Sequence, residues 1–415
     1  MKIELAFKKD TVTAIIPDSN NPVVLTPHIV DMQLPDPETE VTRSIHNPIG
    51  SAPLCDIVKP GENVVIITSD ITRPVPSYQV IPPILRELLT IGVKKEDITV
   101  IFALGSHRKH TEEEMRRLVG DYVYETVSCI DTDPNDCIHV GTSKAGTPYN
   151  VFSKVVNADR RICVGNIEYH YFAGYSGGAK AIMPGVCTRA SIQSNHSMMV
   201  QDGASTGRID GNPVRKDIDE VADFVPIDFI VNVVLDEHKK LLKSFAGHYI
   251  KAHRAGCEFL DGLYRAKIEK KYDIVVVSAG GHPKDINLYQ AQKALDNASF
   301  AVADDGVIIL VASCGEGLGE SAFERWMTSY TPKEMVVKIK ENFELGGHKA
   351  AAISMVLEKA DIFLVSSLTN DFVSSLSLTP FSDVNEAIAA AVAKKGESAS
   401  ICVIPYGGAT LPWLA

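Results

Sequence analysis

The sequence lacks a long hydrophobic run. Although 45% of its 415 residues are hydrophobic, no uninterrupted apolar stretch reaches the roughly 18 to 20 residues that a membrane-spanning helix needs. The first ten residues, MKIELAFKKD, also lack the apolar core of a secretion signal. We therefore expect a cytoplasmic protein without a membrane partner.

Cysteines in metal-binding or redox spacing are also missing. The eight cysteines are scattered along the chain, without a C-x-x-C pair or a short cluster of cysteine and histidine. Structural zinc sites need such spacing, so this class of site is excluded. We expect reduced thiols that are mostly buried, including Cys187, for which packing is the simpler interpretation.

The sequence has no long run of basic residues. Lys and Arg number 41 against 52 Asp and Glu, for a formal net charge of -11. Nucleic-acid phosphates are bound by clustered Lys and Arg, and the short basic segment 267–271 is more simply interpreted as a solvated helix end. We therefore expect no nucleic-acid partner.

What the sequence does contain is short runs of Val and Ile that alternate with helix-like stretches. Runs without polar alternation are typical of parallel strands covered on both faces, which predicts an α/β fold. The expected strands are residues 64–67, 98–103, 162–164, 229–234, 273–277, 306–311, 362–365 and 400–404. The expected helices include residues 82–91, 112–118, 249–270 and 332–342.

The alternation of strands and helices restarts after residue 270. We therefore expect two Rossmann-like α/β domains, residues 1–268 and residues 269–415. Residues 1–59 differ, because polar alternation at 2–7 and 12–16 predicts a β-rich N-terminal segment.

Polar residues gather just after four of the expected strands. They occupy residues 68–74, 104–111, 165–170 and 278–293. In open parallel sheets, ligands bind beyond the carboxyl ends of strands, so we expect an active site in a cleft between the two domains. Each of these residues also has a simpler structural interpretation. Asp70 could form a turn or cap a helix, and His107 could be a cap. His110 could be a surface residue, and Lys293 could be a solvated helix residue.

The most distinctive segment is a glycine-rich turn with two histidines and a lysine around it: His170, Lys180 and, further on, His196. Residues 174–178 match G-x-S-x-G, but the expected strand ends about nine residues earlier, too far for a nucleophile elbow. The segment also resembles a phosphate loop, yet Ala181 follows the lysine where that loop needs Ser or Thr. A nucleoside triphosphatase is therefore not expected.

Five motifs in order along nearly the whole chain together suggest a family. They are Asp70-Ile-Thr-Arg73-Pro74, Gly105-Ser-His107-Arg108, His170-x-x-x-Gly174-x-x-x-Gly178-Ala-Lys180, Asn195-His196 and Tyr289-Gln290-x-x-Lys293. This set resembles the nickel-dependent lactate racemase family. The resemblance implies a nickel pincer nucleotide, a pyridinium-3-thioamide-5-thiocarboxylic acid mononucleotide with nickel, attached covalently to a lysine.

The resemblance also implies a role for each motif residue. Lys180 would carry the cofactor, His196 would bind nickel, and His107 with His170 would be the paired acid–base residues. Residues 1–268 would form the catalytic domain, and residues 269–415 would complete the substrate cleft. The other implied cofactor-binding residues are Gly177, Gly178, Asp70 and Tyr289, and the implied substrate-binding residues are Arg73, Gln290 and Lys293.

The implied activity is that of an isomerase that interconverts D- and L-2-hydroxy acids, lactate first, by hydride abstraction and return. Oxidation to a planar 2-keto acid removes the stereocentre, whereas direct removal of the poorly acidic α-hydrogen is costly. Cofactor-maturation proteins are implied partners, and a chain made without them is expected to lack the cofactor. The alternatives are a racemase or epimerase of a larger 2-hydroxy acid such as malate, an aryl-lactate or a sugar acid, a Schiff-base enzyme that uses Lys180, and a binding protein for small anions.

Overall fold

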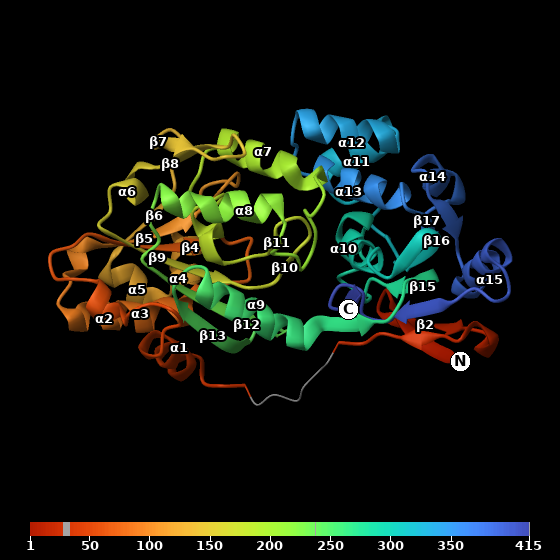
Figure 1. The fold of residues 1–415 in the computed structure, drawn as a ribbon, viewed down its shortest axis with the longest axis horizontal. Coiled ribbons are helices and arrows are strands. Elements are labelled where there is room, and N and C mark those ends of the chain that lie inside the picture. Colours follow the sequence, from red (N-terminus) through yellow and green to blue (C-terminus); the bar gives the residue numbers. More distant parts are fainter. Residues whose placement is uncertain (28–33, 237, 415) are drawn as a thin grey trace. The chain divides into compact units, whose positions relative to one another are not determined.

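The computed structural model describes residues 1–27, 34–236 and 238–414 (Figure 1). The chain folds into two compact units. Unit 1 contains Met1–Val30 and Gly262–Ala415, and unit 2 contains Asp31–Asp261. Each unit has a six-stranded sheet with helices, so the predicted α/β class is confirmed.

The sheet of unit 2 has the order β13-β12-β9-β4-β5-β6. Neighbouring strands are parallel, except that β13 at one edge is antiparallel to β12. The strands are β4 (Val64–Ser69), β5 (Ile98–Ala103), β6 (Ser128–Asp131), β9 (Arg160–Asn166), β12 (Phe229–Leu235) and β13 (Leu241–Gly247). Two short hairpins accompany the sheet, formed by β7 (Cys137–Thr142) with β8 (Pro148–Phe152) and by β10 (Tyr169–His170) with β11 (Gly174–Tyr175).

The helices of unit 2 cover this sheet. They are α1 (Pro37–His46), α2 (Leu54–Ile57), α3 (Ser77–Ile91), α4 (Glu112–Val119), α5 (Asp121–Thr126), α6 (Ser153–Val156), α7 (Arg189–Ser197), α8 (Pro213–Glu220) and α9 (Lys251–Tyr264). Short 3-10 turns are η2 (Lys95–Asp97), η3 (Gly178–Ala181), η4 (Met198–Val200) and η5 (Val221–Asp223).

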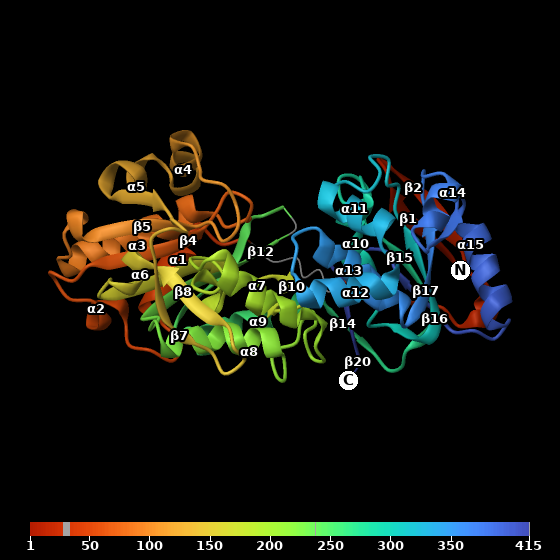
Figure 2. The same cartoon turned by 90° about the horizontal axis from the view of Figure 1, so that it is seen from above.

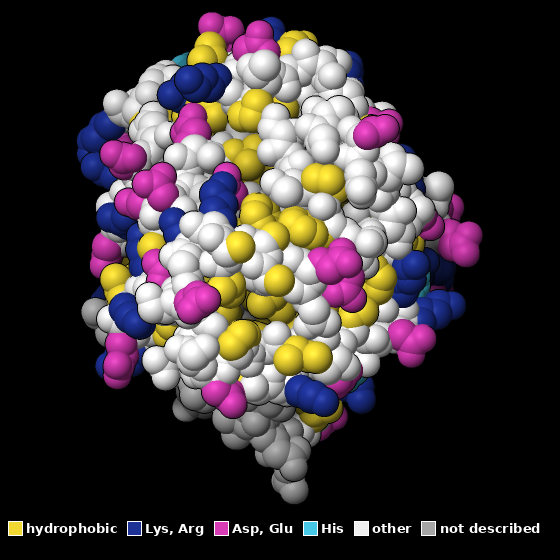
Figure 3. Space-filling view, turned by 90° about the vertical axis from the view of Figure 1, so that its right-hand side faces the viewer, with side chains coloured by type: hydrophobic (Ala, Val, Ile, Leu, Met, Phe, Trp, Pro, Cys, Tyr) yellow, Lys and Arg dark blue, Asp and Glu magenta, His cyan; other side chains and the backbone are white. Residues whose placement is uncertain are grey.

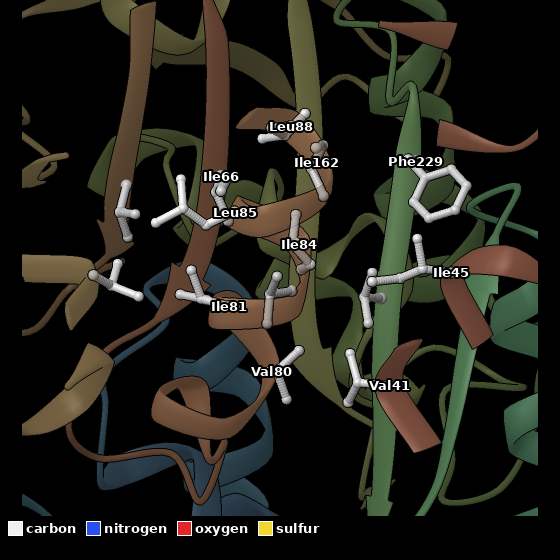
Figure 4. Close-up of a cluster of buried hydrophobic side chains, with 14 of the residues drawn as sticks. Val41, Ile45, Ile66, Val80, Ile81, Ile84, Leu85, Leu88, Ile162 and Phe229 are labelled. Carbon is white, nitrogen blue, oxygen red and sulfur yellow. The ribbon is translucent and has the colours of Figure 1, made fainter. Parts of the chain in front are cut away.

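The core of unit 2 shows why these helices lie on the sheet. Apolar residues of α3 recur at positions 80, 81, 84, 85 and 88, which form one helix face. Figure 4 shows Ile84 of this face beside Ile162 of β9, with Ile45 of α1 near Phe229 of β12. All four side chains are buried, and removing this apolar surface from water is the main force that holds the layers together.

The sheet of unit 1 has the order β18-β17-β16-β15-β19-β3 and is parallel throughout its pairs. Helices α10 and α13 pack on one face, and α15 with the β1–β2 hairpin packs on the other (Figures 1 and 2). The strands are β1 (Lys2–Phe7), β2 (Asp10–Ile15), β3 (Val23–Val24), β14 (Arg265–Ile268), β15 (Tyr272–Ser278), β16 (Val302–Val311), β17 (Ala360–Val365), β18 (Thr379–Phe381), β19 (Ile401–Ile404) and β20 (Leu411–Leu414). The helices are η1 (Asp18–Asn20), α10 (Leu288–Ala298), α11 (Ser321–Ser329), α12 (Pro332–Glu341), α13 (Gly347–Leu357), α14 (Asn370–Ser375) and α15 (Val384–Lys395).

The N-terminal segment differs from the sequence expectation in two ways. Leu5 and Ile16 of the first hairpin share a core with Ile274 of β15, so this hairpin packs in unit 1 and not with the rest of residues 1–268. The expected β-rich segment also contains a helix, α1. Its first turn is stabilised by Pro37 at the first helical position and by Asp36, whose Oδ2 accepts a hydrogen bond from Thr39 N at 2.9 Å.

All eight expected strands are present, but the expected helix 249–270 is wrong at its end. Helix α9 ends at Tyr264, and β14 follows it and pairs in parallel with β20 near the C-terminus. The partner strand lies more than 140 residues away in the sequence, so no local pattern reveals the pairing.

In the part of the chain that the structure describes, no helix has the length and apolar character needed to cross a bilayer. On the face drawn in Figure 3, Lys and Arg side chains are interspersed with Asp and Glu.

Candidate functional site

Three of the predicted polar loops meet at one edge of the sheet in unit 2. Strand β4 lies between β5 and β9; the chain leaves β4 on one side to form β5 and β6 and returns on the other side at β9. Ligands bind at such a reversal of strand order, beyond the carboxyl ends of the strands. Asp70 follows β4, His107 follows β5 and His170 lies four residues beyond β9, so all three belong to this edge.

The Asp70 carboxylate holds the His107 ring. Asp70 Oδ2 lies 2.5 Å from His107 Nδ1, and Thr72 Oγ1 donates to both carboxylate oxygens at 2.9 and 3.1 Å. Burial raises the pKa of Asp70, but the hydrogen bond and charge of His107, with Thr72 and Arg73, outweigh burial and hold this pKa below its ordinary value. The carboxylate therefore accepts a hydrogen bond from Nδ1, and whenever the ring carries one proton its lone pair lies on Nε2.

His110 is buried, and its interpretation as a surface residue is wrong. Its side chain is 1% exposed, and its Nδ1 lies 2.6 Å from Asp131 Oδ1 on the neighbouring strand β6. Its Nε2 accepts a hydrogen bond from Ile71 N at 3.0 Å. His110 thus joins the loop after β5 to the residue that follows Asp70.

His170 lies in the β10–β11 hairpin, opposite Gly174. Its Nδ1 accepts a hydrogen bond from Ala173 N at 3.3 Å. Burial, followed by the charges of Lys180, His196 and Arg73, holds the pKa of His170 well below its ordinary value. The ring is therefore neutral at physiological pH, and it shares its surroundings with three other residues that the sequence motifs singled out.

The glycine-rich turn has a backbone that only glycine adopts easily. Gly177 and Gly178 have φ angles of +77° and +63°. A Cβ on Gly177 would lie 2.8 Å from Asn232 Oδ1, and a Cβ on Gly178 would lie 3.0 Å from the His253 ring. Close packing inside unit 2 explains both glycines, and their contact with a cofactor stays a prediction.

Lys180 follows this turn in η3 and is partly buried. Burial, followed by the positive charges of Arg215 and Arg73, holds the pKa of the Lys180 amine well below its ordinary value. An amine without its proton is a nucleophile, whereas an ammonium group is not. The local environment therefore prepares this side chain for covalent chemistry.

His196 lies in the last turn of α7. Its Nδ1 is 3.0 Å from Asn195 Oδ1, and its ring centroid is 4.9 Å from that of Phe172. Phe172 also packs edge-on against His170, with centroids 4.5 Å apart. The buried Phe172 ring is therefore in contact with both imidazoles.

Arg215 is a site residue that the sequence analysis missed. This fully buried side chain donates to the carbonyl oxygens of Ala173, at 3.2 Å, and Tyr175. It also forms an ion pair with Asp219, with Nη1 3.5 Å from Oδ1. Arg215 thus holds the chain just before the glycine-rich turn. No sequence signal identifies it, because Lys216 and Asp217 also lie between the apolar Val214 and Ile218 on α8.

The remaining predicted residues lie in unit 1, on helix α10. Asn287 caps this helix by accepting a hydrogen bond from Gln290 N at 2.9 Å, and the side chains of Gln290 and Lys293 are exposed. Lys349 Nζ donates to Tyr289 O at 2.8 Å. Burial and the charge of Lys293 lower the pKa of Lys349 to about 8.

Conventional metal ligands do not cluster in the described residues. Within that part of the chain, no group of three or more His, Cys, Asp or Glu side chains is arranged to hold a metal ion. A metal at this sheet edge would need most of its ligands from a bound group, because His196 by itself offers one nitrogen.

The sequence resembles known proteins along nearly its whole length. Residues 7–207 match the lactate racemase N-terminal domain, and residues 268–411 match the lactate racemase C-terminal domain. The lactate racemase of Thermoanaerobacterium thermosaccharolyticum is 32% identical over 98% of this chain and 97% of its own length. That of Lactiplantibacillus plantarum is 33% identical over 98% of both chains.

Solved structures give the same result. The lactate racemase apoprotein from Thermoanaerobacterium thermosaccharolyticum superimposes with a TM-score of 0.88, at 32% identity and over all of both chains. A protein from Thermotoga maritima, at 20% identity, shares the fold with a TM-score of 0.62 over 92% of this chain and all of its own. The full-length matches show that the chain belongs to the lactate racemase family.

Proposed function

We propose that this chain racemises 2-hydroxy acids, with lactate as the first substrate to test. The observation that supports the proposal is the sheet edge of unit 2, where His107 is bonded to a carboxylate and where the pKa values of His170 and Lys180 are both held well below their ordinary values. The named relatives support lactate as the first choice. As a racemase, the chain would be an isomerase.

The residues of this edge fit the nickel pincer nucleotide that the family implies. Lys180 offers an amine in the form that makes a covalent bond. His196, whose Nδ1 lies 3.0 Å from Asn195 Oδ1, offers an imidazole nitrogen as a nickel ligand. When bound, this group would accept a hydride from the substrate carbon and return it.

His107 is set up to take the proton of the substrate hydroxyl. Its Nε2 carries the lone pair, and the positive ring that forms on protonation is stabilised by the Asp70 carboxylate 2.5 Å away. Such a carboxylate–histidine pair is a common way to orient and strengthen a general base.

His170 suits proton transfer at the second position. Burial and the nearby positive charges lower its pKa, so its protonated form is a stronger acid than an ordinary imidazolium. A proton that reaches this ring is therefore passed on readily to the oxygen of a keto acid. Two imidazoles are useful because the two enantiomers present their hydroxyl groups differently.

The substrate carboxylate needs a positive partner. Arg73 lies in the loop after β4, and its exposed guanidinium can form two parallel hydrogen bonds with a carboxylate. From the family resemblance, we propose that Gln290 and Lys293 of α10 also bind substrate and that Tyr289 contacts the cofactor.

The lowered pKa of Lys180 also suits a Schiff-base enzyme, the second candidate function. Such an enzyme would form an imine between Lys180 and a keto acid, and borohydride would reduce that imine to a stable amine. Mass spectrometry of the Lys180 peptide after borohydride treatment separates the two functions. In a cofactor-loaded racemase, the Lys180 amine would already be bonded to the cofactor and would gain no such adduct.

The proposed function is tested by loading the chain with cofactor. The protein is co-produced with the cofactor-maturation proteins, its intact mass is measured, and a panel of single-enantiomer 2-hydroxy acids is followed by chiral chromatography. We expect added mass on the wild type, none on Lys180→Ala, and equilibration of D- and L-lactate. Activity on malate, an aryl-lactate or a sugar acid in place of lactate would reassign the substrate, and a fully loaded but inert protein would contradict the proposal.

A further inference from the structure

A buried hydrogen-bond chain leads from His196 away from the sheet edge. Asn195 Oδ1 lies 3.0 Å from His196 Nδ1, and Asn195 Nδ2 donates to Asp217 Oδ2 at 2.7 Å. Asn195 is 0% exposed and Asp217 is 1% exposed. These hydrogen bonds connect α7 to α8.

The partners of Asn195 fix which way its amide points. Its Nδ2 side faces two acceptors, the Asp217 carboxylate and the backbone oxygen of Val214 at 3.3 Å. A carboxylate and a carbonyl can only accept, so the NH2 group must lie on this side and the amide oxygen must face His196. That oxygen also only accepts, so His196 Nδ1 has to carry the hydrogen.

This arrangement decides which ring nitrogen of His196 can bind a metal. A neutral imidazole has one N–H and one lone pair. With the hydrogen held on Nδ1, the lone pair is on Nε2. In proteins, the outer hydrogen bond of a metal-binding histidine commonly sets the tautomer and the orientation of the ring.

We propose that Asn195 and Asp217 are positioning residues that hold His196 in its Nδ1–H tautomer and so present Nε2 to the nickel of the bound cofactor. This inference rests on the proposed function for its metal, but the tautomer is a property of the protein without cofactor. Neither residue touches substrate in this assignment, and both act through His196.

Asp217 also makes contacts that do not involve Asn195 and that could stabilise the fold without any effect on His196. Its Oδ1 accepts a hydrogen bond from Ser143, next to the turn between β7 and β8, and its backbone oxygen accepts one from Tyr149 at 2.5 Å. Ser143→Ala removes a hydrogen bond to the same carboxylate without touching Asn195. It is therefore the matched control for Asp217→Asn.

The first test is the tautomer of His196 in the cofactor-free protein. Long-range 1H–15N NMR spectra of protein labelled with 15N-histidine, at about pH 8, distinguish the two tautomers of a neutral ring. The His196 signals are identified by their loss in His196→Gln. We expect the Nδ1–H form in the wild type and in Ser143→Ala.

Asp217→Asn should give a mixture of tautomers. The new side chain can turn its own NH2 group toward Asn195, whose amide can then reverse and donate to His196 Nδ1. Asn195→Ala should give a mixture as well, because it removes the acceptor. A wild-type ring in the Nε2–H form, or an Asp217→Asn ring as uniformly Nδ1–H as the wild type, overturns the proposal. The wild-type spectrum alone can do so if the variants do not fold.

The second measurement is the nickel held per attached nucleotide in loaded protein. Intact mass gives the attachment at Lys180, and elemental analysis gives the nickel. For Asp217→Asn, we expect unchanged attachment with nickel affinity on the order of ten- to a hundred-fold weaker, as for other outer partners of metal-binding histidines. Nickel retention equal to that of Ser143→Ala overturns the proposal. Failure of the wild type to load would count against the proposed function, while the NMR result would still decide the tautomer.

Discussion

Burial has the largest effect on the pKa of the Lys180 amine, followed by the positive charges of Arg215 and Arg73. Together they hold this pKa well below its ordinary value, so the amine loses its proton at a lower pH than an exposed lysine does. Nucleophilic attack needs the neutral form. Lys180 therefore differs from an exposed lysine in its pKa, and its surroundings cause this difference.

This environment predicts unusual reactivity toward a small amine-modifying reagent. In the cofactor-free protein at about pH 7, where an ordinary lysine is almost fully protonated, cyanate should modify Lys180 faster than the exposed Lys144. The advantage should shrink as the pH rises, because ordinary lysines then also become reactive amines. Peptide mass spectrometry of samples quenched over time gives both rates.

Arg73→Gln serves as the matched variant for this experiment. Removing one of the two positive charges raises the pKa of Lys180 toward its ordinary value, so the rate at neutral pH should fall while the rate at high pH stays similar. Equal rates for Lys180 and Lys144 at neutral pH would show that the amine is not activated.

At the scale of elements, His110 is the connection between the loops that follow β5 and β4. Its ring bonds to Asp131 of β6 and to the backbone of Ile71, next to Asp70. His110→Ala leaves the buried Asp131 carboxylate and the Ile71 N–H without these partners. We expect this variant to lose about 2 to 4 kcal/mol of unfolding free energy in urea titrations.

His139→Ala is the control, since this exposed histidine bonds only at the surface, to Asn150 Oδ1 at 2.9 Å. Its unfolding free energy should change by less than about 0.5 kcal/mol. If His110→Ala lowered the unfolding free energy no more than His139→Ala, the hydrogen bonds of His110 would not contribute to stability.

The sequence predicted the elements better than the contacts between them. Runs of Val and Ile marked the inner strands of both sheets because these strands are buried on both faces, whereas the edge strands β3, β6 and β18 were not predicted. Helix α1 was missed, although Asp36 and Pro37 are the start signals of a helix. Strand β14 could not be found, because its partner β20 lies at the far end of the chain.

The same limit applies to the site. Residue types and spacing identified His107, His170, Lys180 and His196. Residues that act on them from other elements of the fold could not be predicted, such as Arg215, which lowers the pKa of Lys180, and Asp217, which bonds the Asn195 amide beside His196. Burial of a charged residue such as Arg215 is visible only once the packing is known.

At the scale of the whole molecule, the first residues of the chain complete the core of unit 1. Leu5 is 0% exposed and packs with Ile274 and Val307 of the parallel sheet. Leu5→Ala should cost about 2 to 4 kcal/mol through lost burial and a cavity. Hydrogen exchange should reveal the loss in β15 and β16, with β4 of unit 2 unchanged.

Thr11→Ala provides the comparison within the same hairpin, because Thr11 is exposed and its replacement should leave the exchange pattern as it was. Faster exchange in β4 and unchanged exchange in β15 after Leu5→Ala would contradict the assignment of the hairpin to unit 1.

We propose that His107 and His170, at one edge of the sheet in unit 2, carry out the proton transfers of a 2-hydroxy acid racemase. The most direct measurement is the change of enantiomer composition with time, starting from one pure enantiomer of the substrate and using cofactor-loaded protein. The wild type should reach an equal mixture. His107→Asn and His170→Asn should carry the same cofactor mass and racemise about a hundred- to ten-thousand-fold more slowly, whereas wild-type rates in both loaded variants would contradict the claim.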